Sequence, residues 1–220
     1  ESATGKRPFS RFWMHRAHLQ IDDAKIAKSE GNTIYLSDII EKGYHPLALR
    51  YLLLTAHYRT SANFTWTALE AAQTSFLKLR RLFDAEDKDG QVPEFWRKKI
   101  HERFNDDLDT PAAIALIWEM LKDGDVARAD AKVLVTDADR ILGLGLGQPD
   151  MLADSLCKKM FGVTVQLDAL PERVGKLVAA RELARKEKNW QQADSLRSEL
   201  QKLGYTLEDT ADGPRVFKKD

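Results

Sequence analysis

Two lysines and a serine lie within five residues of one another in the stretch KIAKS, as Lys25, Lys28 and Ser29. Gly31 follows them, and glycine gives a loop freedom to change its backbone conformation. Cations, a hydroxyl and a glycine in one polar segment would suit a mobile loop that closes over a polyphosphate. The alternative is a solvated surface turn, which composition alone favours because lysine is common on surfaces and turns are polar.

A second candidate site surrounds Trp190, in the polar stretch KEKNWQQAD. A fully buried tryptophan is unfavourable among so many charged and polar neighbours. An exposed ring beside Arg185, Lys186 and Lys188 suits single-stranded nucleic acid, because the ring stacks on bases and the cations meet phosphates. The alternative is a tryptophan that packs across a helix start as a hydrophobic staple.

The elements that must position the lysines begin with residues 1–36, whose short apolar runs divided by charged turns are typical of strands and loops. Ser37 is then expected to cap a short helix that Gly43 ends. Pro46 suits the first turn of the next helix. This helix carries leucines on nearly every side and is expected to be buried.

Longer helices are predicted after residue 65, because apolar residues recur at spacings of three and four. Thr65 is expected to cap the first of them and Thr110 a later one. The predicted helices cover 66–86, 93–107, 109–124 and 125–143. Short loops between them favour an antiparallel helical bundle over residues 37–145.

The end of the chain predicts a separate α+β unit. Residues 146–170 break the helical pattern around one short amphipathic piece and are interpreted as a linker. Residues 171–220 predict a helical hairpin broken near Asn189, followed by a β-hairpin that turns at Asp212-Gly213. The expected fold class is therefore mainly α, with this small domain at the end.

Composition excludes several classes of protein. Lys+Arg and Asp+Glu both number 34, so no global field indicates a nucleic-acid partner. The single cysteine, Cys157, excludes a disulfide framework, and no apolar run is long enough for a membrane span. The first residues lack an initiator methionine and a signal-peptide core, so we expect a chain cut from a longer protein.

Other conspicuous residues have ordinary explanations. The tryptophans that lie in apolar patterns are expected in the core: Trp13, Trp66, Trp96 and Trp118. Arg80 and Arg81 are expected as solvated charge on a helix face, and Cys157 as a quiet thiol. His15 and His18 lack a third ligand nearby, so no metal site is expected in this chain.

Three segments in order resemble the C-terminal half of cysteinyl-tRNA synthetase, a class I aminoacyl-tRNA synthetase: FWMHRAHLQIDDAKIAKSEGN, YHPLALRYLLLTAHYRTSANFTW and FNDDLDTPAAIALIWEMLKD. KIAKS stands where that class carries Lys-Met-Ser-Lys-Ser, with Ile26 and Ala27 as departures. PLALRY looks like the Asp-Ala-Leu-Arg helix of the bundle that meets the anticodon stem. The segment from Ala184 to Val216 resembles the small anticodon-binding domain of the same family.

The resemblance implies an ATP-dependent ligase of the cytoplasm that joins cysteine to its tRNA and has no membrane partner. In the family reaction ATP activates cysteine as an adenylate, and positioned cations stabilise the charge that develops on the leaving pyrophosphate. By resemblance, Lys28 contacts the ATP phosphates, Lys25 is a second catalytic lysine, and Ser29 donates its hydroxyl. The residues aligned with the anticodon site are Arg185, Trp190, Asp194, Arg197 and Asp209.

The nucleotide-binding fold of that family and its zinc ligands are expected outside this chain. ATP and cysteine would therefore bind through a missing catalytic domain, and the fragment alone is expected to be inactive. Two rivals remain open: an ATP-dependent ligase that couples cysteine to an amino sugar, and a non-catalytic RNA-binding module. The tail from Pro171 argues against the first rival, which needs no anticodon reader.

Overall fold

The structure is a computed structural model, and it describes residues 2–8, 10–21, 24–25, 33–84, 90–210 and 213–219. The chain forms two compact units, residues 1–76 with 98–116 and residues 77–97 with 117–220. Three helices contribute residues to both units: α3 (Trp66–Arg80), α4 (Glu94–Asn105) and α5 (Thr110–Met120). The fold is mainly helical, as the sequence predicts. Within the described ranges, no helix has the length and apolar character needed to cross a membrane.

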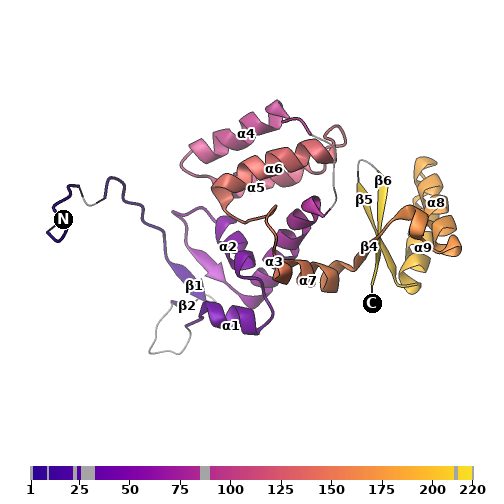
Figure 1. The fold of residues 1–220 in the computed structure, drawn as a ribbon, viewed down its shortest axis with the longest axis horizontal. Coiled ribbons are helices and arrows are strands. Elements are labelled where there is room, and N and C mark those ends of the chain that lie inside the picture. The colour runs from indigo at the N-terminus through magenta and orange to yellow at the C-terminus, as the bar shows by residue number, and fades with distance from the viewer. Residues whose placement is uncertain are drawn as a thin grey trace. The chain divides into compact units, whose positions relative to one another are not determined.

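The first unit contains a small sheet whose central strand is β1 (Leu19–Ile21). This strand pairs antiparallel with β2 (Ala24–Lys25) and parallel with β3 (Ala62–Phe64). Helices α1 (Leu36–Glu41) and α2 (Pro46–Leu54) connect β2 to β3 along the chain (Figure 1). The short strands expected before residue 36 are thus present.

Two predicted helix starts in this unit are confirmed. Pro46 is the first residue of α2, where its fixed φ suits the helix and its missing N–H is not needed. Thr65 precedes α3, and its Oγ1 accepts a hydrogen bond from the backbone N–H of Ala68 at 3.0 Å.

Two other predicted caps are wrong by one or two residues. Ser37 lies inside α1, and the carboxylate of Asp38 instead accepts from the backbone N–H of Tyr35 at 2.8 Å. Thr110 is the first residue of α5, and Asp109 caps that helix through the N–H of Ala112. In both cases a neighbouring carboxylate, a stronger acceptor than a hydroxyl, satisfies the helix start.

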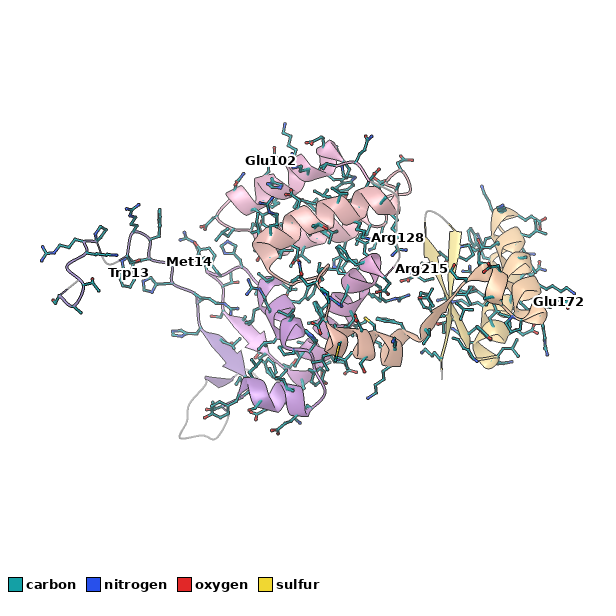
Figure 2. All side chains as sticks on the ribbon, viewed as in Figure 1. Trp13, Met14, Glu102, Arg128, Glu172 and Arg215 are labelled. Atoms are coloured by element: carbon teal, nitrogen blue, oxygen red, sulfur yellow. The ribbon has the colours of Figure 1, made fainter. Side chains whose placement is uncertain are left out.

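Two predictions about burial also need correction. In α2 only Ala48 and Tyr51 are buried, whereas the leucines remain half-buried. Trp13 is 74% exposed and lies with Met14 on an extended segment rather than in a core (Figure 2). Trp96 is buried as expected.

The second unit contains α6 (Arg128–Leu142), which buries Leu134, Val135 and Leu142. Helix α7 (Met151–Phe161) and strand β4 (Val163–Val165) follow, so the predicted linker 146–170 holds regular structure. Gly162 joins them with φ +89°, and a Cβ there would lie 2.4 Å from the carbonyl oxygen of Lys218. Only glycine fits this position.

The predicted helical hairpin and β-hairpin at the end of the chain are confirmed. Helices α8 (Glu172–Lys186) and α9 (Trp190–Lys202) break at Asn189, whose side chain accepts from Gln192 N–H. Strands β5 (Tyr205–Thr210) and β6 (Gly213–Lys218) pair antiparallel. The sequence missed that β4 adds to β6, which makes β6 the central strand of the sheet.

Helices α8 and α9 lie against this sheet (Figure 1), and a compact apolar core joins them to it. Its buried members come from α8, α9, β5 and β6: Val174, Val178, Leu200, Tyr205, Leu207 and Val216. The core gives the C-terminal element set a fixed surface on which polar side chains are displayed.

Candidate functional site

Only the backbone of Lys25 in the KIAKS segment lies within the described residues. Lys25 is the last residue of β2, where its backbone lies opposite Gln20. Its side chain, and all of Lys28 and Ser29, lie outside the described residues. The phosphate-contacting roles of these three residues therefore stay predictions.

Trp190 is the first residue of α9, and 59% of its surface is exposed. Asp194 and Arg197 follow at spacings of four and seven, which places them on the same face of the helix. Both are exposed. This face offers an aromatic ring, an acceptor and a cation, which is the combination that unpaired bases and phosphates can use.

Arg185 and Asp209 contact each other directly through an ion pair. Asp209 also accepts two hydrogen bonds from Arg181, at 2.7 Å from Nη1 to Oδ1 and 3.0 Å from Nη2 to Oδ2. The hydrogen bond from Arg181, together with Arg185, lowers the pKa of Asp209 although partial burial opposes this. Asp209 thus ties β5 to α8 and keeps Arg185 beside it.

The two groups of predicted residues remain separate. In the part of the chain that the structure describes, no hydrogen bond or ion pair joins Trp190, Asp194 or Arg197 to the Arg185–Asp209 pair. The first group presents exposed side chains along α9. The second is already engaged, so Arg185 and Asp209 offer only their remaining hydrogen-bonding capacity to a ligand.

Sequence reasoning missed Arg181, which is only 4% exposed. A signal for it exists, because it follows Val174 and Val178 at helical spacing on the buried face of α8. A charged residue on an apolar stripe needs a partner inside the protein. Asp209 supplies that partner, and Glu182 lies 2.7 Å from the same Nη1.

A polar cluster of the first unit was also missed. Asp107 accepts from the Tyr58 hydroxyl at 2.6 Å, and its Oδ2 lies 2.6 Å from Nε of Arg59. His57 Nε2 lies 3.0 Å from the Asp107 carbonyl oxygen. The Tyr58 hydrogen bond, followed by that from Arg59, lowers the pKa of Asp107. The cluster holds Asp107 and Leu108 at positive φ of 52° and 56°.

Arg80 and Arg81, expected as solvated charge, are both buried at 6% exposure. Arg80 makes an ion pair with Asp154 at 3.0 Å and donates to the carbonyl oxygens of Gly145 and Leu146. The surface prediction is wrong because these arginines find partners far along the chain, which helix periodicity does not show.

Cys157 is buried beside α3, and burial raises the pKa of its thiol to about 11. The thiol is therefore protonated at neutral pH and a poor nucleophile. Across the described ranges, no three histidine, cysteine, aspartate or glutamate side chains gather closely enough to hold a metal ion. The described residues do not fit a zinc site.

Comparison with known proteins identifies the chain at two places. Residues 1–74 match the family model of the class I (C) tRNA synthetase catalytic domain. Residues 167–215 match that of the cysteinyl-tRNA ligase anticodon binding domain. The second match covers α8, α9, β5 and the first part of β6. Both matches are to the cysteinyl-tRNA synthetase family.

Individual relatives agree with this assignment. The chain is 36% identical over 209 residues to cysteine–tRNA ligase 1 of Burkholderia lata, covering 94% of this chain and 41% of the relative. Similar matches reach cysteine–tRNA ligases of Chlamydia felis, at 33% over 96% and 45% of the two chains, and Caldicellulosiruptor saccharolyticus, at 34% over 98% and 48%. The chain therefore spans less than half the length of these curated cysteinyl-tRNA synthetases.

The family assignment confirms the resemblance read from the sequence. All five residues predicted near the anticodon fall inside the part matched by the anticodon binding domain: Arg185, Trp190, Asp194, Arg197 and Asp209. The KIAKS loop falls inside the part matched by the catalytic domain.

Proposed function

We propose that this chain is the C-terminal, tRNA-binding portion of a cysteine–tRNA ligase of the cytoplasm. The whole enzyme would activate cysteine with ATP and transfer it to cysteine tRNA. This chain would contribute the ATP-closing loop, a helical bundle over residues 37–145 that meets the tRNA stem, and an anticodon reader over 171–220. Zinc and the nucleotide-binding fold would lie in the remainder of the enzyme.

The exposed ring of Trp190 is the observation that carries the proposal. It stands in the region similar to an anticodon binding domain, on a helix face that also presents Asp194 and Arg197. A base can stack on the ring, while carboxylate and guanidinium groups can read the edges of neighbouring bases. Arg185 and Asp209 would add a charged pair from α8 and β5.

In the same proposal, Lys28 contacts the ATP phosphates, supported by Lys25 and by the hydroxyl of Ser29. Lysine suits this role because it is a compact point charge on a flexible stem. The amino-sugar ligase is disfavoured, since the match to an anticodon binding domain over 167–215 has no use in that reaction.

Trp190→Ala tests the anticodon role directly. Loss of one stacking platform, about 1–3 kcal/mol per base, is expected to weaken binding of a cysteine-tRNA anticodon stem-loop by about 5-fold or more. Fluorescence anisotropy with a labelled stem-loop measures this, and far-UV circular dichroism checks the fold.

Trp13→Ala is the matched control, because Trp13 is an exposed tryptophan that lies outside both the bundle over residues 37–145 and the region matched by the anticodon binding domain. It should leave affinity unchanged. Equal affinity of Trp190→Ala and the unaltered chain, with both folded, would remove Trp190 from the site.

A further inference from the structure

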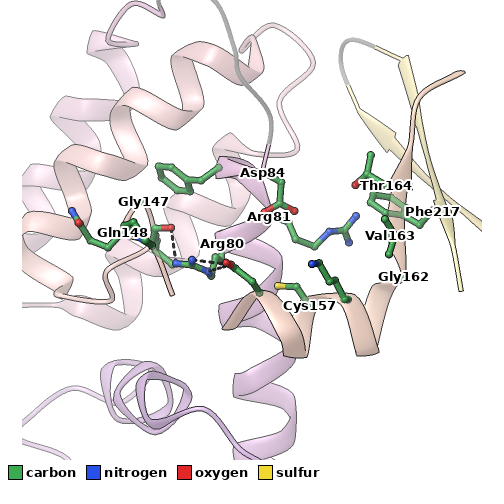
Figure 3. A pocket seen from close by; sticks show the side chains of 15 residues that line it. Arg80, Arg81, Asp84, Gly147, Gln148, Cys157, Gly162, Val163, Thr164 and Phe217 are labelled. Carbon is green, nitrogen blue, oxygen red and sulfur yellow. Dashed lines mark hydrogen bonds and ion pairs between the residues drawn. The ribbon is translucent and has the colours of Figure 1, made fainter. Parts of the chain in front are cut away.

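The second unit contains a cavity of about 510 Å³ that no predicted site residue lines. Its walls come from the end of α3, from α7, and from strands β4 and β6 (Figure 3). Arg81 and Asp84 face Gly162, Val163 and Phe217 across it, as the close view shows. The cavity thus lies where the sheet of the small domain meets the helices before it.

Arg81 is the central cation of this cavity. Its guanidinium lies between two phenyl rings, 4.5 Å from the centre of Phe161 and 3.9 Å from that of Phe217. Its Nη2 approaches Glu208 Oε2 at 2.8 Å, yet makes no hydrogen bond of good geometry with any residue that the structure describes. A buried guanidinium that still has donors to offer suits an anionic oxygen.

Further cations surround Arg81. Arg215 Nη1 donates to the Arg81 carbonyl oxygen, and Arg128 Nη2 donates to the same oxygen at 3.1 Å (both residues are labelled in Figure 2). Burial, then Arg128 and Arg81, lower the pKa of Arg215, which shows that these cations repel one another. Lys158 lines the cavity from α7 with its side chain exposed.

The carboxylates of the cavity do not cancel this charge evenly. Asp154 is neutralised by Arg80 through the ion pair at 3.0 Å. Asp84 also lines the cavity, and burial raises its pKa above the ordinary value although Arg215 and Arg81 oppose the rise. An anion that enters would meet the carboxylate of Asp84 and would compete with Glu208, 2.8 Å from Nη2, for the guanidinium of Arg81. Lys158 and the Thr164 hydroxyl would add further donors.

A phosphate fits this cavity better than a nucleobase does. The face of Phe217 is covered by Arg81, and Lys132 lies over the ring of Phe83, so the aromatic walls already carry cations. The small domain is nearly neutral, because residues 171–220 hold 11 lysines and arginines against 9 acidic residues. Each specific contact with RNA therefore supplies a larger share of the affinity. Non-specific attraction for RNA is weak there.

We propose that this cavity is a subsite for one phosphodiester group of the RNA backbone, held by Arg81 and Lys158. The inference rests on the proposed tRNA-binding function and adds to it a contact that is independent of base identity. Such a contact would fix the position of the RNA while the bases are read elsewhere.

Lys158→Ala tests the subsite in the full chain, with Lys159→Ala as the matched control from the same helix, outside the cavity. Binding of the anticodon stem-loop is measured at several salt concentrations. Loss of one phosphate contact is expected to weaken binding about 3-fold or more and to reduce the slope of log K against log salt by about 0.7–0.9. The loss should be equal for a stem-loop with an altered anticodon.

Asp84→Asn provides a change of opposite sign, because it removes the opposing carboxylate and is expected to tighten binding. If Lys158→Ala matches Lys159→Ala in both affinity and salt slope, or if the loss appears only with the cognate anticodon, the subsite is overturned while anticodon reading stands. If the unaltered chain does not bind the stem-loop, the proposed function falls and the subsite with it.

Discussion

An aspartate pairs with an arginine in each of the two units, Asp107 with Arg59 and Asp209 with Arg181, and the two pairs differ in how exposed the arginine is. Asp107 in the first unit meets Arg59, which is 66% exposed at its side chain. Asp209 in the second unit meets Arg181, which is 5% exposed. The two carboxylates themselves are similarly exposed, at 45% and 43%.

This difference decides how much each pair contributes to stability. An exposed arginine that loses its partner returns to water at little cost. A buried arginine that loses its partner leaves a charge in an apolar environment, and that penalty exceeds the interaction itself. Asp209 is therefore a structural requirement of the small domain, whereas Asp107 mainly orders a loop.

Asp209→Asn should have the largest effect. It leaves the buried Arg181 without its full partner and is expected to lower the free energy of unfolding by about 2–3 kcal/mol, somewhat less than for a fully buried pair. Urea unfolding followed by circular dichroism measures the change. Asp194→Asn is the control, since this exposed aspartate makes no ion pair with any residue that the structure describes. A loss for Asp209→Asn as small as that of the control would contradict the structural role of Asp209.

Lowering the pH should have a smaller effect, a difference between the unaltered chain and Asp209→Asn in the stability that each loses. The pKa of Asp209 is lowered in the folded chain, so its contribution is complete above the ordinary carboxyl value and is lost as pH falls through the lowered value. Between about pH 6 and about pH 3, the unaltered chain should lose more stability than Asp209→Asn. Parallel pH profiles would show that the pair does not contribute through its charge.

Asp107→Asn should have the smallest effect, clearly below that of Asp209→Asn. Asparagine tolerates the positive φ of 52°, so the substitution changes charge without adding backbone strain. The same urea titration measures it. A loss as large as that of Asp209→Asn would show that burial of the arginine is not what distinguishes the two pairs.

Features set by neighbours in sequence were predicted well. Pro46, Thr65 and Asn189 mark helix starts because each acts through its own ring or side chain within three residues. The caps predicted at Ser37 and Thr110 were wrong because each residue stands beside an aspartate. The carboxylate of that aspartate accepts the hydrogen bond at the helix start instead. The exposure of Trp190 was also accessible, since its neighbours are polar.

Features set by distant residues could not be predicted. Arg81 meets Phe161 and Phe217, and Arg181 meets Asp209, through contacts that no spacing along one helix reveals. Strand β4 has three residues and gains its identity only from pairing with β6, about fifty residues later. For the candidate site, the sequence indicated the residues but not that Arg185 and Asp209 form an ion pair with each other.

The central place of β6 has a consequence for synthesis of the chain on the ribosome. Helices α8 and α9 and both outer strands are synthesised before β6. The position between the two outer strands therefore stays empty until β6 is synthesised and its buried residues Val216 and Phe217 fill it. The small domain therefore completes its folding late and in one step, after β6 has been synthesised. A nascent chain halted just before β6 exposes two unpaired strand edges that can pair with other chains.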